Sequence, residues 1–390
     1  MTDSLGPRPR VWPLSVYPAS RARPGLVAVR DAAGYGRSVL VPWAAISVLH
    51  LLDGTRTVDE ARAAVAARGR TPPPTTLLEC VLKTLDLAGL VDTPASRAAR
   101  ARIDAAFLSL PERPPVHAGS VYPASQGDIL RGLAGEQVGG EPLPQRALVP
   151  HIDWSRGRAA YARAYTALRG SVDRYERVIL LGTAHAGLEE PAAVYTKPYR
   201  TPSGILPNDL EAIAALTDAL PWLRKEEAAH RWEHSIEINA ALLRAVWPED
   251  RPLRAIPMLV ASPTGALASS PQRAFALAAA LRDLLAADPG RTLVLAAGDL
   301  AHLGRLYGDP PVEGHCPGGL EDLDRSLVLA ALAGNTDAIL RHAQAPAARR
   351  VCGLGPLWLM AATHPSSSAS VVHWQVWMGH GSLVSFAFGA

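Results

Sequence analysis

Three short apolar runs, each followed closely by a histidine or an aspartate, constrain the fold of this chain more than any other feature. The clearest run, Val178–Leu181, is β-branched at its start and too short for a buried helix, so it predicts a strand covered on both faces. The run ends at Gly182, and His185 follows three residues later. In open α/β sheets, sites lie at the carboxyl ends of the strands, so His185 is a candidate site residue.

Two further apolar runs repeat this pattern. One leads directly into His151, and the other leads into Asp299 and, three residues later, His302. If the three predicted strands are parallel neighbours, these side chains converge with His185 on one edge of one sheet. This convergence is the central hypothesis about function.

Two carboxylate–imidazole pairs are candidates for proton transfer. Asp299 and His302 follow a strand and suit an acid–base pair or a pair that orients other groups, although Asp299 can instead cap a helix beside an incidental histidine. His234 and Glu237 lie three residues apart at a predicted helix start, so Glu237 can orient the imidazole. The alternative for this second pair is a solvated first turn whose acidic residues the helix dipole favours.

A metal site is a further interpretation of the histidines that follow the predicted strands. His151, His185 and Cys352 offer two imidazoles and a thiolate, which leave an open position on a metal and suit iron, copper or zinc. The three residues lie far apart in the sequence, so spacing alone leaves open that they are unrelated and that Cys352 is a small buried apolar residue. His315 and Cys316 lie in a Gly/Pro-rich stretch that reads as a surface loop.

The region from about residue 115 to 390 alternates predicted strands and helices. Strands at 178–181, 254–260 and 293–297 are separated by helical patterns at 209–220, 233–246 and 273–286, and a further helix is expected at 320–332. This alternation predicts an α/β sandwich with a mixed, largely parallel sheet.

Residues 1–95 predict a separate small α+β domain, followed by a linker at 96–114. Two short strands precede a helix, a capping box at Thr57–Glu60 opens a second helix, and a third begins after Pro74. This order resembles the PqqD-like, winged-helix type of domain, which implies a peptide or partner-protein ligand. A packing module without a ligand is the alternative, and DNA binding is disfavoured because Lys83 is the one basic residue of the third helix.

Composition excludes several classes of partner. The chain has 390 residues and a net charge of +3, from 39 Lys+Arg against 36 Asp+Glu, which gives no reason to expect nucleic-acid binding. Three scattered cysteines favour a reducing compartment, and neither a secretory signal nor a run of about 18 apolar residues is present, so we expect a cytoplasmic protein without a membrane partner. Motifs of nucleotide-dependent enzymes, serine hydrolases and zinc fingers are absent from the sequence.

Several motifs together resemble those of the Memo family, known in prokaryotes as AmmeMemoRadiSam system protein B. The similar stretches follow the family's order from residue 116 to the end: VHAGSVYPAS, LVPHIDWSRG, VILLGTAHAG, YRTPSGILPND, WEHSIEINAALL, AIPMLVAS, AAGDLAHLG, VCGLGP and LVSFAFGA. The set is far more specific than any one motif. It implies the three-layer fold of class III extradiol dioxygenases, in which two histidines and a carboxylate hold ferrous iron.

The resemblance implies a role for each candidate residue. His151 and His185 fall at the two histidine-ligand positions, and Cys352 falls where Memo proteins keep a cysteine and the dioxygenases a carboxylate. Asp299, His302 and His234 are then expected to line the cleft as acid–base groups or as supports of the ligands.

Some positions depart from the family pattern. Ala186 replaces a histidine that is frequent in the family, and Ala301 and Leu303 replace a serine and a tyrosine. These changes keep the metal ligands but alter the lining of the cleft. A thiolate in place of a carboxylate shifts the expected metal towards copper or an oxidisable iron centre and weakens the ring-cleavage interpretation.

Three hypotheses about function follow. The first is a redox-related protein that binds Fe(II) or Cu, with Zn as a further option, at His151, His185 and Cys352. The second is an oxidoreductase acting on a small aromatic substrate, with His234 or His302 as base. The third is a non-catalytic scaffold that binds a small-molecule or peptide ligand in the cleft, with AMMECR-type and radical-SAM proteins as the partners that the family's system name implies.

Overall fold

The computed structural model describes residues 5–18, 25–134, 143–307, 309–344, 350–363 and 370–390, and the chain divides into two compact units. The first unit comprises Met1–Ser109 with two short later segments, Gly304–Val312 and His380–Ser382. The second comprises Leu110–Leu303, Glu313–Gly379 and Leu383–Ala390. Much of the expected linker belongs to helix α4 (Pro94–Leu108), and the expected boundaries near 95 and 115 stay predictions.

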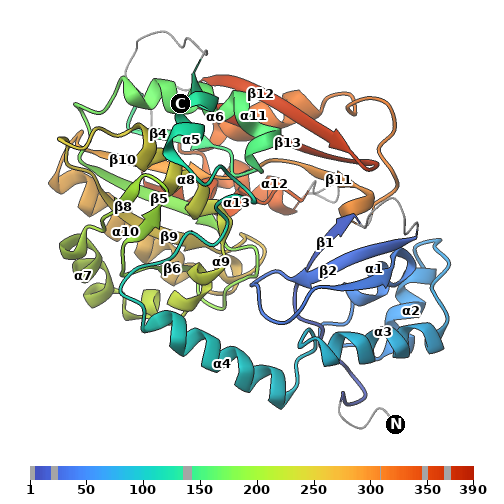
Figure 1. Ribbon diagram of the computed structural model, residues 1–390. Helices are drawn as coiled ribbons and strands as arrows, with labels where there is room; N and C mark the ends of the chain where they lie inside the picture. Colours follow the sequence, from blue (N-terminus) through green and yellow to red (C-terminus); the bar gives the residue numbers. More distant parts are fainter. Residues whose placement is uncertain (1–4, 19–24, 135–142, 308, 345–349, 364–369) are drawn as a thin grey trace. The chain divides into compact units, whose positions relative to one another are not determined.

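The first unit is a small antiparallel sheet with helices (Figure 1). Its strands, in sheet order, are β1 (Leu14–Pro18), β2 (Leu26–Asp31) and β3 (Val39–Pro42), and its other helices are α1 (Trp43–Leu49), α2 (Val58–Ala66) and α3 (Thr75–Leu87). Strand and helix side chains share one apolar core, which includes Val27, Ile46 and Leu85. The capping box that opens α2 is confirmed, because the Thr57 and Glu60 side chains each accept from the other's backbone amide. The likeness to a PqqD-like domain stays a prediction.

The second unit is built on an eight-stranded mixed sheet, in the order β11-β13-β4-β10-β5-β9-β6, with β12 paired to β13. The strands are β4 (Arg146–Val149), β5 (Arg177–Thr183), β6 (Ala192–Val194), β9 (Arg254–Val260), β10 (Thr292–Ala297), β11 (His302–Gly304), β12 (Val371–Gly379) and β13 (Ser382–Gly389). Strands β4, β10, β5 and β9 run parallel, whereas β6 and β13 run antiparallel to their neighbours. A separate hairpin pairs β7 (Tyr199–Thr201) with β8 (Gly204–Leu206).

Helices cover both faces of this sheet, which confirms the predicted α/β sandwich. They are α5 (Gln126–Leu133), α6 (Trp154–Arg169), α7 (Leu210–Ala219), α8 (His234–Val246), α9 (Ala266–Ser269), α10 (Pro271–Ala287), α11 (Leu320–Leu332), α12 (Thr336–Gln344) and α13 (Leu354–Thr363), with the 3-10 helices η1 (Pro221–Arg224) and η2 (Glu227–Arg231). A further 3-10 helix, η3 (Arg305–Tyr307), belongs to the first unit. Ile179 and Leu181 of β5 join one core with α10, α11, α12 and α13. Their neighbours Val178 and Leu180 point to the opposite face, where α8 contacts β5, because successive side chains of a strand alternate.

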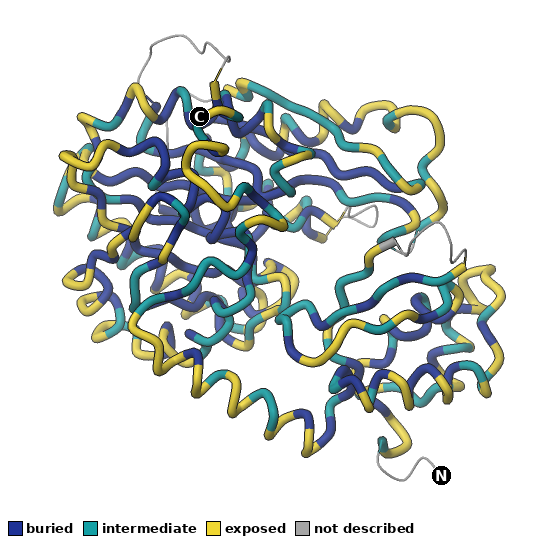
Figure 2. Tube along the Cα trace, viewed as in Figure 1, coloured by how far each residue is buried: buried dark blue, intermediate teal, exposed yellow. Residues whose placement is uncertain are grey.

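Burial explains why the strands have no polar alternation. Every residue from Val178 to Thr183 is buried, as expected for a strand with helices on both faces. Figure 2 shows the buried sheet inside the second unit and exposed outer surfaces on its helices. Within the described ranges, no helix combines the length and apolar character needed to cross a bilayer.

Candidate metal centre

The three strands that precede the candidate residues are adjacent and parallel. The sheet order is β4, β10, β5, and His151, Asp299 and His185 each lie two residues beyond the end of the corresponding strand. Parallel neighbours end at the same edge of the sheet, so the chain delivers two imidazoles and a carboxylate to one place. The condition on which the sequence hypothesis depended is therefore met.

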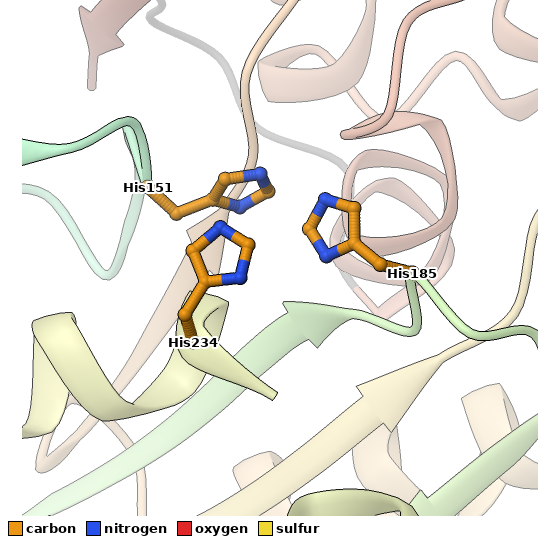
Figure 3. A group of neighbouring side chains, drawn as sticks. All are labelled: His151, His185 and His234. Carbon is orange, nitrogen blue, oxygen red and sulfur yellow. The ribbon is translucent and has the colours of Figure 1, made fainter. Parts of the chain in front are cut away.

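A third imidazole joins this edge from helix α8. His234 is the first residue of α8, which packs closely on β5 at Gly182, where a Cβ atom would lie 2.4 Å from Ile236 Cγ1. One ligand atom from each of His151, His185 and His234 lies within 4.8 Å of the others, and the ring centroids are 4.8–5.3 Å apart. Figure 3 shows the three rings facing a common centre. We call these three residues the histidine group.

Each imidazole of the histidine group uses Nδ1 for a contact with an oxygen. His151 Nδ1 lies 3.1 Å from the Ala297 carbonyl oxygen, and Glu233 Oε1 lies 2.9 Å from His185 Nδ1 and 3.2 Å from His234 Nδ1. An oxygen acceptor places the proton on Nδ1, so the Nε2 lone pair of each ring remains available. Metal-binding histidines are held in this way by carbonyl or carboxylate acceptors.

Cys352 forms a second group with His151 and Asp299, which we call the thiol group. Cys352 Sγ lies 3.1 Å from His151 Nε2, and Asp299 Oδ2 lies 3.7 Å from the same nitrogen. One ligand atom from each of these residues lies within 4.8 Å of the others. The two groups therefore share His151, which links His185 of the histidine group to Cys352 of the thiol group.

Two glycines allow Cys352 to approach the edge of the sheet. A Cβ on Gly298 would lie 2.6 Å from Gly353 Cα, and Gly353 N donates to the Asp299 carbonyl oxygen at 2.9 Å. Backbone packs directly on backbone at this point. A side chain at either glycine would push the Cys352 loop away from His151.

Burial dominates the electrostatics of the thiol group. It lowers the pKa of His151 well below the usual value, and the nearby His185 and His234 lower it further. Burial also raises the pKa of Cys352 well above its usual value and raises that of Asp299 to about 6. Without a metal, the His151 imidazole is neutral and the Cys352 thiol is protonated at neutral pH. Metal binding to Cys352 would therefore release the thiol proton.

The contact between His185 and Glu233 shifts the pKa of both groups at the rim of the centre. Burial favours the neutral form of each, but their contact outweighs it, raising the pKa of His185 and holding that of Glu233 well below the usual value. The side chains of His185 and His234 are 29% and 30% exposed, whereas that of His151 is 2% exposed. The centre thus has a buried floor and a partly solvated rim.

The family follows from a comparison with known proteins. A family model described as "Memo-like protein" matches residues 113–377. The chain belongs to the Memo-like family. It is 34% identical over 261 residues to a MEMO1 family protein of Thermus thermophilus, covering 66% of this chain and 74% of the relative. A MEMO1 family protein of Aquifex aeolicus is 28% identical over 286 residues, or 72% of this chain and 73% of the relative.

The match to the Memo-like family contains every residue of the histidine and thiol groups. It begins at Arg113, so residues 1–112 lie outside it. The predicted resemblance to the Memo family is confirmed, while the relation to extradiol dioxygenases stays a prediction.

His302 belongs to neither group in this Memo-like protein. Its Nδ1 lies 2.9 Å from the Leu300 carbonyl oxygen, and burial lowers its pKa to about 4, so the ring is neutral at neutral pH. The Asp299 carboxylate accepts instead from the backbone amides of His151 and Ile152, at 3.0 and 3.2 Å. Asp299 thereby fixes the His151 loop, and its role as an acid–base partner of His302 stays a prediction.

The predicted contact between Glu237 and His234 is wrong. Glu237 accepts from Arg113 at 2.6 Å, from the His117 amide at 2.8 Å and from the Tyr122 hydroxyl at 2.7 Å, which occupies both of its oxygens. The residue that contacts His234 is Glu233, which precedes α8 and accepts from the Ser235 amide as its N-cap.

The sequence predicts a helix at 233–246 that includes Glu233, and no local pattern indicates a role for this residue. The signal that would have found it is its position directly before the helix start, because an N-cap side chain folds back towards the first turn. A carboxylate held there lies beside the side chain that begins the helix.

Proposed function

We propose that this Memo-like protein binds a redox-active transition metal, iron or copper, at a centre built on His151, His185 and Cys352. The observation that carries the proposal is the commitment of Nδ1 on the clustered imidazoles to oxygen contacts, which leaves Nε2 for a metal. Cys352 Sγ, 3.1 Å from His151 Nε2, supplies a soft donor on the buried side. The proposed redox chemistry rests only on the imidazole and thiolate donors, which suit iron and copper.

The donors fit some metals better than others. Imidazole suits iron, copper and zinc, and thiolate selects soft ions such as Cu(I) or zinc, whereas magnesium and calcium prefer oxygen ligands. When bound, iron or copper supplies one-electron chemistry; zinc would not. The chain itself supplies a buried floor at His151 and a partly exposed rim at His185, so a small ligand can reach the centre from the rim side.

Metal analysis of protein purified without oxygen tests the proposal. We expect close to one iron or copper per chain in the wild type and a loss of most of it in His185→Ala. His315→Ala is the matched control, because His315 is an exposed histidine outside both groups and its loss should leave the metal content unchanged. Equal metal content in the wild type and His185→Ala would overturn the proposal.

A second candidate function is oxidation of a small aromatic substrate. The observation that favours it is the partly exposed rim at His185 and His234, through which a small ligand can reach the centre. His302, whose Nδ1 is held by the Leu300 carbonyl oxygen, is the base that this function would use. Oxygen uptake by the metal-loaded protein with a panel of catechols should then depend on His302 and fall in His302→Gln. No uptake with any catechol would contradict this second candidate and leave metal binding untouched.

A further inference from the structure

The geometry points to His234 as an additional ligand of the proposed metal, and to Glu233 as the residue that positions both His185 and His234. We propose a centre in which three imidazoles, rather than two, face the metal. The inference rests on the proposed metal binding. It changes the role expected for His234 from acid–base group to ligand.

His234 satisfies the geometric condition for a ligand as well as His185 does. Its ring stacks on that of His185 at a centroid distance of 4.8 Å and an interplanar angle of 23°, and lies 5.3 Å from the ring of His151. The three side chains come from two strand-end loops and one helix terminus, yet their rings meet at one centre (Figure 3). A ligand atom of His234 lies within 4.8 Å of those of both other rings.

A second histidine near α8 shows what a purely structural imidazole looks like in this chain. His230 is buried, and both of its nitrogens contact oxygens: Nδ1 lies 2.8 Å from the Tyr199 hydroxyl and Nε2 lies 2.9 Å from the Ala193 carbonyl. His234 has a partner at Nδ1 only, and among the described residues no protein group contacts its Nε2 by a hydrogen bond. An imidazole held at one nitrogen and open at the other is oriented for a ligand that the chain does not provide.

Glu233 ties the two rim histidines to one carboxylate. Its Oε1 contacts both Nδ1 atoms and accepts from the Ser235 amide at 3.0 Å, while its Oε2 accepts from the His185 amide at 3.0 Å. The side chain is 6% exposed, so water cannot easily replace these contacts. One residue therefore fixes the loop after β5, the start of α8 and the rings that both carry.

Pulsed EPR and competition titration of the full chain loaded with Cu(II) alone test both parts. We expect the wild-type spectrum to report three coordinated imidazoles, and the His234→Ala spectrum to report two. His234→Gln, which retains most of the side-chain volume, should lose the same nitrogen and guards against a folding artefact. Affinity for Cu(II) should fall by about 10–100-fold in Glu233→Gln, which is the usual effect of removing the partner of a metal-binding histidine.

Two matched controls separate this effect from general damage. Glu227→Gln alters another buried carboxylate, which accepts from the Thr196 amide and lies outside both groups. It should bind Cu(II) like the wild type, as should His315→Ala.

The outcomes distinguish the inference from the proposal beneath it. If the wild type binds no metal, metal binding itself fails. If the wild type binds metal but both His234 variants keep its spectrum and affinity, His234 is not a ligand. If Glu233→Gln matches Glu227→Gln in affinity, Glu233 does not position the rim histidines.

Discussion

Two buried carboxylates at the start of helix α8 have very different surroundings. Glu237 pairs with Arg113, whose guanidinium is fully buried and also donates to the backbone carbonyl oxygens of Pro114, His230 and Glu233. Glu233, about one helical turn earlier, contacts two imidazoles and two backbone amides. One carboxylate has a permanent cation as its side-chain partner, whereas the side-chain partners of the other are two imidazoles.

The different partners of Glu237 and Glu233 indicate different roles, one in stabilising the fold and the other in orienting the site histidines. A buried carboxylate with a full set of donors and an arginine is satisfied, and it anchors the segment from Arg113 to Tyr122 against α8. A buried carboxylate that faces imidazoles leaves the outer nitrogens of those rings available for chemistry. The anchored region should therefore govern stability, and the region around Glu233 should govern metal binding.

The largest expected effect follows from removing the anchor. Arg113→Met leaves the Glu237 carboxylate buried without a cation and should lower the free energy of unfolding by about 3–5 kcal/mol. Urea denaturation measures it. Arg251→Met is the control, because the Arg251–Asp173 pair is half exposed or more and should contribute less than about 1 kcal/mol. Similar losses in the two variants would mean that Arg113 is no anchor.

Removing the metal should act on the other region. A metal at 100 times its dissociation constant stabilises the folded chain by about 2.7 kcal/mol, and a chelator should cancel this gain. Thermal unfolding with and without chelator therefore gives two midpoints for the wild type but a single one for His151→Ala. If the wild-type unfolding midpoint were the same with metal and with chelator, the region around Glu233 would not differ from the anchored region by holding a metal.

A smaller effect is expected where the two site loops touch. Gly298→Ala forces a Cβ to within 2.6 Å of Gly353 Cα, so the loops must separate, at a cost of about 1–3 kcal/mol, and Cys352 should move away from His151. Gly318→Ala is the matched control, since nothing lies within 4 Å of a Cβ there. Unfolding midpoints and metal affinities should both fall in the first variant only, and a wild-type result for Gly298→Ala would contradict the close approach.

The smallest effect concerns acid stability at a third buried carboxylate, which resembles Glu237 in its partner. Burial opposes the charge of Asp209, but Arg177 and the Ala212 amide hold its pKa below the usual value. Because the pKa of Asp209 is lower in the folded chain than its unfolded value near 4, the charged carboxylate stabilises the fold at pH values above about 4. This stabilisation is lost as the pH falls below that value. Asp209→Asn should thus cost about 1 kcal/mol at pH 7, and the difference from wild type should shrink between pH 5 and 3. If the stability difference between wild type and Asp209→Asn stayed constant from about pH 5 to 3, the pKa of Asp209 would not be lowered in the folded chain.

Local signals in the sequence were sufficient to predict the central parallel strands and several helices of the second unit. The run Val178–Leu181 lies in β5, the strand expected at 254–260 is β9, and the helix expected at 320–332 is α11. These elements have strong apolar periodicity or clear ends. Helix α13 lacks such a signal because it is buried on almost every side, so its apolar residues show no stripe.

The contacts that organise the site depend on distant residues. Arg113 lies in a proline-flanked stretch that reads as linker, and its partner Glu237 follows 124 residues later. Nothing local distinguishes it from the exposed arginines of the chain. His151 and His185, by contrast, stand just after predicted strands, which is why their convergence could be expected before their contacts were known.

Diffraction from crystals of the purified protein, with anomalous differences recorded at the iron and copper absorption edges, would show whether a metal lies between His151 and His185. We predict one strong peak, at one of the two edges, within bonding distance of Nε2 of both His151 and His185. If the protein carries stoichiometric iron or copper but the peak lies away from these two nitrogens, the metal is not bound at this edge of the sheet.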